Sequence, residues 1–345
     1  MSAKTYRVGV VGATGAVGDE MIRTLFARKF PLASLRLFAS AKSKGKTLAA
    51  GGAKIKVEEA GADVFKDLDL ALFSAGSAVS KRLAQHLVTG TTGCVVVDNS
   101  SAWRMDPEVP LIVPEVNADA LTRESLRRRI VANPNCSTIQ MVVALKPLQD
   151  AAGLKRVIVS TYQAVSGAGA RAMFELADQT RAVLAGKPAT PEFLPHRIAF
   201  NVFSHNSPMQ PNGYNEEEIK MINETRKILG VPDLAVTATC VRVPVMRGHA
   251  EAVWVETERP LSPDDARGLL AKAPGIVVDE DPVKNRYPMP VDAAGRGEVF
   301  VGRIRRDLSH PHGLVLWVVS DNLLKGAALN AVQIAEELIR RQLIG

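Results

Sequence analysis

The stretch YRVGVVGATGAVGDEMIRTLFAR, residues 6–28, decides the fold of the first part of the chain. Residues 6–11 form an apolar run typical of a buried strand, and residues 19–28 place apolar side chains at helical spacing. Further short strands are expected at 35–39, 68–74, 94–98, 111–113 and 130–132, with a helix at 80–89. Strands that alternate with helices predict a doubly wound, mainly parallel α/β sheet of the Rossmann type.

Three glycines lie between the first strand and its helix, Gly12, Gly15 and Gly18. A strand, a glycine loop and a helix together form the usual cradle for a dinucleotide pyrophosphate, because the backbone can approach the phosphates and the helix N-terminus offers free N–H groups. The spacing G-x-x-G-x-x-G departs from the usual G-x-G-x-x-G, which leaves a tight turn without a ligand as the alternative. We favour the dinucleotide site, because the loop follows the first strand of an alternating domain.

The end of the second strand indicates which dinucleotide to expect. An NAD enzyme normally has Asp or Glu there to bind the ribose 2′-OH. This chain instead reads Ser40-Ala-Lys42-Ser43-Lys44, two cations with two hydroxyls. Those groups suit the 2′-phosphate of NADP, although a polar surface turn would have a similar composition.

The second half of the chain has a different pattern. Strands are expected at 156–164, 235–245, 250–256, 299–305 and 314–319, and helices at 137–151 and 323–343. These strands are longer, alternate more strongly and have fewer helices between them, which predicts an α+β domain with a mixed or antiparallel sheet. Residues 186–213, rich in Pro and Asn, read as a long excursion. We therefore expect two domains, 1–137 completed by a C-terminal helix at 322–345, and 138–321.

Composition excludes several classes of protein. The three cysteines, Cys94, Cys136 and Cys240, are far apart and form no C-x-x-C pair, which argues against a disulfide framework or a zinc site and suits a reducing cytoplasm. No signal peptide and no apolar run of the ~18 residues needed for a membrane helix are found. The net charge of +7 comes without a nucleic-acid-binding motif. We expect a cytoplasmic protein without a metal, nucleic-acid or membrane partner.

Cys136 is the candidate nucleophile. It lies in ANPNCST, residues 132–138, after a strand and at the start of a helix. A helix N-terminus stabilises a thiolate, and the side-chain amide of Asn135 with the N–H of Cys136 could face a developing oxyanion. Cysteines more often merely pack, but that interpretation suits Cys94 and Cys240, each within an apolar strand, better than a loop of Asn and Pro.

The proton-transfer partner of such a cysteine is not fixed by the residues alone. The chain has six histidines, at positions 86, 196, 205, 249, 310 and 312. His249, at a turn after an apolar strand, has the most suggestive context, but two or three choices remain open on this reasoning.

Motifs along the whole chain resemble those of aspartate-semialdehyde dehydrogenases, enzymes of the aspartate pathway to lysine, threonine and methionine. They are GATGAVG, FASAKSKGK, NSSAWRMD, NPNCST, TYQAVSGAG, NGYNEEEIKM, CVRVPVMRGHAE and SDNLLKGAALNAVQ. Several of these motifs are long and specific. The resemblance implies an NADP-binding domain followed by a catalytic and dimerisation domain, in a homodimer or a tetramer built from dimers.

The resemblance also implies roles for single residues. Cys136 matches the acylated nucleophile, Gln163 the residue that orients the substrate, and His249 the general acid/base. Arg242 matches the residue that binds the substrate α-carboxylate, and Glu217 the one that binds its α-amino group. The choice of Glu217 from the triplet 216–218 rests on its place one helical turn before Lys220.

The remaining matches concern phosphate and the cofactor. Lys220 and Arg104 match the pair that binds the substrate phosphate. The residues that match NADP contacts are Thr14, Gly15, Ala16, Val17, Lys42, Ser43, Ser166, Gly167 and Asn322. The candidate cofactor site also includes Gly12 and Gly18 of the glycine loop and Ser40 at the end of the second strand. The implied reaction is the reductive dephosphorylation of L-aspartyl-4-phosphate through a thioester on Cys136.

Two rival interpretations remain at this point. N-acetyl-γ-glutamyl-phosphate reductases share the chemistry, but their cysteine typically lies in an NPGCY-like context, whereas this chain has NPNCST. A nucleotide-binding relative without catalysis could lose the cysteine or the histidine, yet the whole matched set is present.

Overall fold

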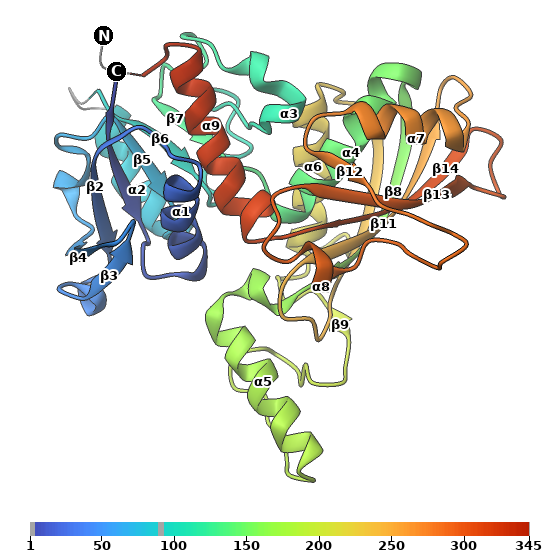
Figure 1. Cartoon of the computed structure of the whole chain (residues 1–345), viewed down its shortest axis with the longest axis horizontal. Helices are drawn as coiled ribbons and strands as arrows, with labels where there is room; N and C mark the ends of the chain where they lie inside the picture. The colour runs from blue at the N-terminus through green and yellow to red at the C-terminus, as the bar shows by residue number, and fades with distance from the viewer. Residues whose placement is uncertain (1–3, 89–92, 345) are drawn as a thin grey trace. The chain divides into compact units, whose positions relative to one another are not determined.

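The computed structural model describes residues 4–88 and 93–344. Contacts between Cα atoms divide the chain into two compact units. The first contains the described residues of Met1–Asn135 and Ala327–Gly345, and the second is Cys136–Gly326. Figure 1 shows the elements of both units in chain order. Within the described residues, no helix is long and apolar enough to cross a membrane.

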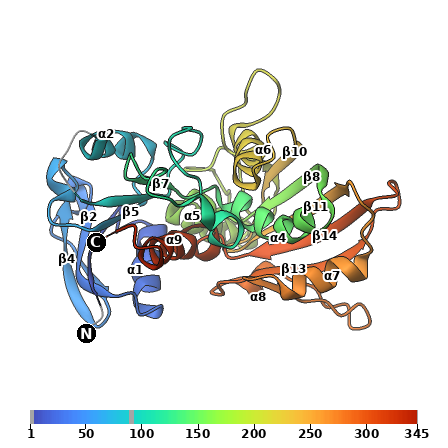
Figure 2. The same ribbon diagram turned by 90° about the horizontal axis from the view of Figure 1, so that it is seen from above.

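The first unit is built on a seven-stranded sheet in the order β3-β4-β2-β1-β5-β6-β7. Its strands are β1 Tyr6–Val11, β2 Leu32–Ala39, β3 Thr47–Ala50, β4 Ala53–Glu59, β5 Leu70–Phe73, β6 Val95–Asp98 and β7 Ile130–Ala132. Its main helices are α1 Ala16–Ala27, α2 Ser77–Val88 and α9 Leu329–Arg340, and α3 Pro114–Asn117 is a single turn. All pairings are parallel except β3 with β4, so the expected doubly wound domain is confirmed. Figure 2 shows α2 on one side of this sheet and α1 with α9 on the other.

The first unit differs from the sequence expectations in three places. Residues 111–113 do not form a strand but only an isolated bridge from Leu111 to Ala132, because prolines at 110 and 114 flank the segment and α3 begins at once. The β3–β4 hairpin was not expected. Its turn uses Gly51 and Gly52, both at positive φ (57° and 85°), which is the backbone that a two-residue hairpin turn requires. The helix expected at 80–89 begins earlier, at Ser77, and its last expected residue lies outside the described residues.

The second unit contains a seven-stranded mixed sheet in the order β12-β13-β14-β11-β8-β10-β9. The strands are β8 Leu154–Gln163, β9 Phe203–Ser204, β10 Ala235–Arg242, β11 His249–Thr257, β12 Ile276–Val278, β13 Val299–Arg306 and β14 Gly313–Ser320. The helices are α4 Cys136–Ala152, α5 Ala170–Leu184, α6 Glu216–Leu229, α7 Pro263–Lys272 and the single turn α8 Pro290–Ala293. Helices α4, α6 and α7 pack on the sheet and α4 contacts the other two, which confirms the expected mixed α+β architecture.

The register of three central strands gathers side chains at one edge of this sheet. Strands β8 and β10 are parallel, and their last residues, Gln163 and Arg242, are ladder partners. Strand β11 runs antiparallel to β8 and begins at that same edge with His249. Three side chains that are far apart in the sequence are therefore neighbours because their strands end or begin together.

The excursion at 186–213 is organised by polar residues of α5. The Glu175 carboxylate accepts hydrogen bonds from the backbone N–H groups of residues 192, 193 and 194, at 2.9–3.0 Å. The Gln179 side-chain oxygen accepts from the N–H groups of residues 198 and 199. A small apolar cluster that includes Leu176 and Ile198 closes this substructure. The stretch shows little periodicity because buried side chains of α5, rather than a ladder, satisfy its backbone.

Glu251 is an unexpected buried acid on β11. It is fully buried, and neither carboxyl oxygen has a hydrogen-bond partner among the described residues. Its ladder partner Thr161 is also buried and has an unpartnered hydroxyl in this part of the chain. Burial raises the pKa of Glu251 well above its ordinary value, and the side chain of Gln140 on α4 opposes this only in part. Burial therefore favours the protonated form of this carboxyl in the folded protein.

This buried acid predicts how stability depends on pH. The unfolded Glu251 ionises above about pH 4.3, whereas the folded one keeps its proton, so the free energy of unfolding falls as pH rises through that value. Glu251→Gln keeps the shape and removes the titration. We expect its Tm at pH 8 to exceed that of the original chain by about 2–4 °C, the shift that ~1 kcal/mol causes in a protein of this size. The advantage should shrink below about pH 4.3.

Glu256→Gln is the matched control. Glu256 lies on the same strand but is partly exposed and pairs with Arg156 at 3.2 Å. Thermal unfolding followed by circular dichroism from pH 4 to 8 compares the two variants. A pH-independent difference between Glu251→Gln and the original chain would show that the folded carboxyl ionises normally.

Candidate active site

Cys136 is the first residue of α4 and the only cysteine of the chain that is not fully buried. Cys94 and Cys240 are both buried at 0% exposure. Burial raises the pKa of the Cys94 thiol to about 12 and that of the Cys240 thiol further. The backbone of Gly326 packs against Cys136, since a Cβ on that glycine would lie 2.9 Å from the cysteine Cβ. The structure therefore shows two buried thiols and one partly exposed thiol, and the reactivity of Cys136 stays a prediction.

Gln163 connects the start of α4 with α6. Its side-chain nitrogen donates to the Ser137 hydroxyl at 2.7 Å and to a Glu217 carboxylate oxygen at 3.4 Å. Ser137 is the residue after Cys136, so Gln163 contacts the neighbour of the candidate nucleophile. Its role in orienting a substrate stays a prediction.

His249 is held in one tautomer. Its Nδ1 accepts a hydrogen bond from the Ala164 N–H at 3.0 Å, so the proton of the neutral ring is on Nε2. Nε2 is buried and has no partner among the described residues. Burial, with a contribution from Arg242, lowers the pKa of His249 to about 3, so the ring is neutral at physiological pH. The resting His249 therefore presents an unused N–H donor.

Gly167 leaves the space between Arg242 and His249 open. A Cβ at this position would lie 3.0 Å from the Arg242 Nη1 and 3.1 Å from the His249 Nε2. Both functional groups therefore face the same small region beside a backbone without a side chain. Any larger residue at 167 would occupy the place where a ligand could touch both.

Arg242 is buried, with 1% of its surface exposed, and burial lowers its pKa. Its Nη1 donates to the Ala164 carbonyl at 2.8 Å. Its Nη2 donates to the His205 Nε2 at 2.7 Å and to the Asn206 side-chain oxygen at 2.9 Å. A buried guanidinium with a planar set of donors is the group best suited to a carboxylate.

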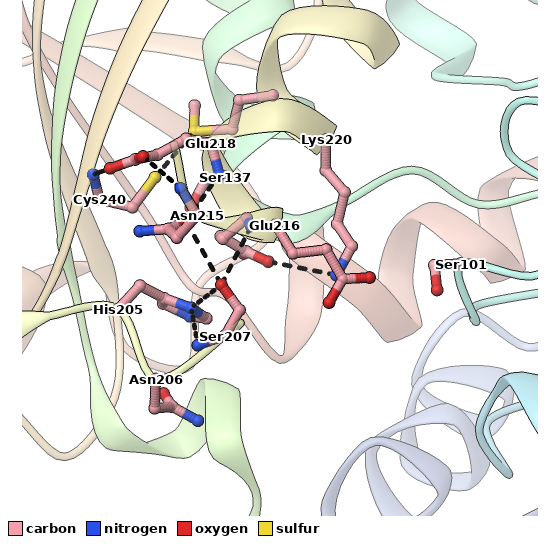
Figure 3. A network of polar contacts seen from close by, with 12 residues as sticks. Ser101, Ser137, His205, Asn206, Ser207, Asn215, Glu216, Glu218, Lys220 and Cys240 are labelled. Atoms are coloured by element: carbon pink, nitrogen blue, oxygen red, sulfur yellow. Dashed lines mark hydrogen bonds and ion pairs between the residues drawn. The ribbon is translucent and has the colours of Figure 1, made fainter. Parts of the chain in front are cut away.

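The loop that contacts this guanidinium was not expected from the sequence. His205, Asn206 and Ser207 follow the short strand β9, and Figure 3 shows His205 turned toward Ser207. The His205 Nε2 lies 2.7 Å from the Arg242 Nη2, and its Nδ1 lies 3.1 Å from the Ser207 hydroxyl and 3.2 Å from the Ser207 backbone nitrogen. Burial lowers the pKa of His205 to about 4. The negative charge of Glu217 acts in the opposite direction, whereas the positive charges of Arg242 and Lys220 lower the pKa further. No periodicity marked this loop, and the only signal was one histidine among six.

The structure separates the three carboxylates at the start of α6. Glu218 forms a capping box with Asn215 and also accepts from the Cys240 N–H, so it stabilises the helix and the sheet. Glu216 is about half exposed and lies 3.7 Å from the Lys220 ammonium (Figure 3). Glu217 is buried, lies 3.7 Å from the same ammonium and accepts a hydrogen bond from the Gln163 side chain. Only Glu217 therefore combines burial with a place beside the other candidate residues.

Two of the three glycines in the glycine loop of the first unit lie where a side chain would clash with backbone. A Cβ on Gly12 would lie 2.3 Å from the Ser74 carbonyl oxygen, and one on Gly18 would lie 2.2 Å from the Gly12 carbonyl oxygen. Gly15 is the N-cap of α1 and a Cβ there would meet only an ordinary contact. The first N–H groups of α1 therefore have no capping side chain from residue 15, and Thr14, Ala16 and Val17 lie at that helix start.

The turn after β2 lies beside a carboxylate of a neighbouring strand, which the local sequence did not reveal. Lys44 pairs with Glu59 of the neighbouring strand β4 at 3.2 Å. Ser43 is buried and its hydroxyl lies 3.5 Å from that of Thr14, whereas Ser40 and Lys42 are exposed. Ser43 and Lys42 thus remain beside the glycine loop, while Lys44 is already neutralised.

Ser166 and Asn322, both expected to contact the cofactor, bind each other in the second unit. The Ser166 hydroxyl donates to the Asn322 side-chain oxygen at 3.0 Å, and the Gly248 N–H donates to the same oxygen at 2.9 Å. Any further contact by this amide must therefore use its nitrogen.

Two expected site residues belong to the first unit. Arg104 is buried and donates to the carbonyls of Asn133 and Asn99 at 3.0 and 2.9 Å. Asn135 is buried at the end of that unit, directly before Cys136 in the chain. The backbone bonds fix the direction of the Arg104 guanidinium without neutralising its charge.

Comparisons with known proteins agree on one family. The family model described as semialdehyde dehydrogenase, NAD binding domain, matches residues 7–124, and that described as semialdehyde dehydrogenase, dimerisation domain, matches residues 145–325. An aspartate-semialdehyde dehydrogenase of Aquifex aeolicus is 53% identical over 98% of this chain and 99% of its own length.

Solved structures give the same result. The crystal structure of aspartate semialdehyde dehydrogenase II from Vibrio cholerae, complexed with ASA, has a TM-score of 0.93 and 46% identity over 98% of this chain and 99% of that one. An aspartate semialdehyde dehydrogenase from Candida albicans, solved with NADP, has a TM-score of 0.75 and 26% identity over 99% of this chain and 100% of that one.

The exposure of the three thiols predicts how they react. In the native protein, iodoacetamide should alkylate Cys136 at least about 100-fold faster than Cys94 or Cys240, because only a thiolate that the reagent can reach reacts. Peptide mass spectrometry over a time course measures each rate. All three cysteines should react at similar rates in denaturant, and early modification of Cys94 in the folded chain would contradict the assignment.

Proposed function

Because the chain belongs to the aspartate-semialdehyde dehydrogenase family, we propose that it converts L-aspartyl-4-phosphate to L-aspartate-4-semialdehyde with NADPH, through a thioester on Cys136. This reaction leads to lysine, threonine and methionine. The observation that carries the proposal is the meeting of Gln163, Arg242 and His249 at one edge of the mixed sheet, with Gln163 bonded to the neighbour of Cys136.

The amino-acid end of the substrate is proposed to bind Arg242 and Glu217. Arg242 is a buried cation suited to the α-carboxylate, and Glu217 is a buried anion suited to the α-ammonium. Lys220, next to Glu217, and Arg104 are proposed to bind the phosphate. Opposite charges on the two anchors would orient an amino acid in one direction only, which places its side-chain acyl group consistently.

The Cys136 thiolate attacks the acyl carbon, the bond from that carbon to the phosphate oxygen breaks, and phosphate leaves with the bonding pair. NADPH, when bound, supplies the hydride that reduces the thioester. The tetrahedral oxyanion then re-forms its carbonyl bond, the carbon–sulfur bond breaks, and Cys136 regains its thiolate. The Nε2–H of His249 is positioned to donate to the oxyanion, and the amide of Asn135 is a second proposed donor.

The residues of the first unit fit a dinucleotide phosphate. Gly12 and Gly18 permit the tight turn, and the start of α1 carries no side-chain cap from Gly15. Ser43 and Lys42 offer a hydroxyl and a cation for a 2′-phosphate, with Ser40 beside them, so NADP is proposed over NAD. In the second unit, Ser166, Gly167 and Asn322 are the proposed contacts.

Domain roles, assembly and compartment complete the proposal. Residues 1–137 with 322–345 are proposed to bind NADP, and residues 138–321 to perform catalysis and dimerisation. A homodimer, or a tetramer built from dimers, is supported by the match of residues 145–325 to a dimerisation domain. Tyr162 on the sheet is 39% accessible, and its ring is tilted against that of Trp317 with the centroids 5.5 Å apart. The three cysteines form no disulfide, which favours a cytoplasmic, reducing location.

The experiment that tests this function is the reverse reaction. Aspartate semialdehyde, phosphate and NADP⁺ are mixed with the protein, and NADPH absorbance is followed. Cys136→Ala should reduce kcat by at least about 10⁴-fold, because covalent catalysis is lost, while NADP⁺ binding by calorimetry is retained. Replacing NADP⁺ by NAD⁺ should lower kcat/KM by about tenfold or more, as expected when a 2′-phosphate contact is lost.

Cys94→Ala is the matched control, because Cys94 is buried within the first unit and the variant should retain activity. Substantial turnover by Cys136→Ala would rule out the covalent mechanism. A preference for NAD⁺ would leave the reaction intact and refute the interpretation of Lys42 and Ser43.

The charge of Glu217 separates this function from reduction of an N-acetylated, longer substrate. Glu217→Gln should lower kcat/KM for aspartate semialdehyde by about 10- to 100-fold, because the substrate ammonium loses a buried partner. N-acetylglutamate semialdehyde, which lacks that ammonium, should be a very poor substrate of the original chain.

Glu216→Gln is the control for this role, since Glu216 is equally close to Lys220 but about half exposed. Its effect should stay within about threefold, the size of an exposed ion pair. A larger effect at 216 than at 217 would move the ammonium site, and a preference for the acetylated semialdehyde would overturn the proposed activity.

A further inference from the structure

The guanidinium of Arg242 donates hydrogen bonds to a side chain of the protein along its Nε and Nη2 edge. Both Nε and Nη2 point to the same acceptor, the Asn206 side-chain oxygen, at 3.3 and 2.9 Å. The Nε and Nη2 edge of arginine is the one that takes a carboxylate through two parallel hydrogen bonds. The amide oxygen of Asn206 therefore occupies a place that the proposed function gives to the α-carboxylate of the substrate.

The partners of Arg242 named above are uncharged. Asn206 contributes an amide oxygen, Ala164 a carbonyl, and His205 a neutral imidazole. These acceptors satisfy the donors of a buried cation but do not neutralise it. The nearest named carboxylate, Glu217, interacts with Arg242 only through its longer-range charge.

We propose that the Asn206 side chain is a displaceable stand-in for the substrate α-carboxylate, because it accepts hydrogen bonds from Arg242 until the carboxylate takes its place. A ligand group must then bind Arg242 more strongly than Asn206 does in order to displace it. This inference rests on the proposed function, because it takes Arg242 as the carboxylate anchor. Asn206 is then a specificity-determining residue of the amino-acid site.

The physical properties of the two groups make the exchange favourable. Hydrogen bonds from a guanidinium to a carboxylate are about twice as strong as those to a neutral oxygen. Asn206 is exposed, so its amide regains water when it leaves, whereas Arg242 stays buried. A ligand with a negative charge at this position gains more than the stand-in loses, and a ligand with a neutral amide or ester gains nothing.

His205 and Ser207 keep the stand-in in place without blocking its release. His205 accepts from Arg242 and lies beside the Ser207 hydroxyl, which in turn donates to Asn215 at 3.3 Å and accepts from the Glu217 N–H at 3.1 Å. Figure 3 shows this chain running from the loop to the start of α6. The two residues that flank Asn206 therefore anchor the loop to the helix that carries Glu217, and only the Asn206 side chain has to rotate.

Two substitutions at Asn206 test the proposal through opposite effects. Asn206→Asp is isosteric and places a permanent carboxylate on Arg242, so KM for aspartate semialdehyde should rise at least about tenfold, with the change falling on KM rather than kcat. Its Tm should rise, because the buried cation gains a charged partner. Asn206→Ala removes the competitor and should lower KM, by up to about fivefold. A residue that merely supports the loop would show the reverse order, with Ala worse than Asp.

The penalty of Asn206→Asp should depend on the ligand. For 3-aminopropanal, the same aldehyde without the α-carboxylate, the ratio of kcat/KM between Asn206→Asp and the original chain should be close to one. Asn212→Asp is the matched control, since it adds the same charge in an exposed turn of the same loop and keeps the acceptor for the Tyr214 N–H. It should change neither KM nor Tm appreciably.

Arg242→Lys distinguishes failure of this inference from failure of the proposed function. If Arg242→Lys raises KM strongly but Asn206→Asp does not, Arg242 is the anchor and Asn206 is no stand-in. If Arg242→Lys has no effect on KM, the carboxylate binds elsewhere and the proposed role of Arg242 fails first. A KM that rises in Asn206→Ala as much as in Asn206→Asp would also overturn the proposal.

Discussion

The burial of one cation, Arg242, constrains most of the second unit. A guanidinium with 1% of its surface exposed must have its donors satisfied, and here backbone and neutral side chains do this. The same charge helps to hold His249 and His205 in their neutral forms, because each would otherwise place a second cation beside the first. The hydrogen-bond partners of Arg242 named above are thus neutral, and Glu217 acts on it through longer-range charge, which suits the guanidinium to an anionic group of a ligand.

The strand register explains how so few elements build this site. Gln163 and Arg242 are neighbours because β8 and β10 are parallel and end together, and His249 joins them because β11 starts where β8 ends. The start of α6 is pinned by the capping box of Asn215 and Glu218, which frees Glu217 to face Gln163. A carboxylate that caps the helix and the carboxylate proposed to bind the substrate ammonium thus occupy adjacent positions of one helix turn.

Much of the fold followed from periodicity and turn chemistry, and the failures have physical causes. The alternating first domain and the mixed sheet were predictable, since their strands bury regular apolar faces. The segment at 111–113 failed because flanking prolines limit it to one bridge. Helix α5 was missed because its buried face includes Glu175 and Gln179, which bind loop N–H groups and break the apolar pattern.

The site was predictable to the extent that local context marks chemistry. Cys136 stood out through its place at a helix start, whereas the histidine remained open among six until the family resemblance pointed to His249. His205, Asn206 and Ser207 were invisible, because their role exists only through contact with a strand 36 residues or so further along the chain. Glu251 was also not expected, because the sequence does not show that this acidic residue of a strand is buried.

The tautomer of His249 narrows where the protons of the reaction can go. With Nδ1 bonded to the Ala164 N–H, the neutral ring can only donate through Nε2. Nε2 already carries the proton and has no lone pair for the thiol proton of Cys136. Protonation of Nδ1 would break the bond from Ala164 and place a cation next to Arg242, which the buried site disfavours. Under the proposed mechanism the thiolate is therefore stabilised by the start of α4, since helix N–H groups favour an anion there, and His249 acts as a donor to the oxyanion.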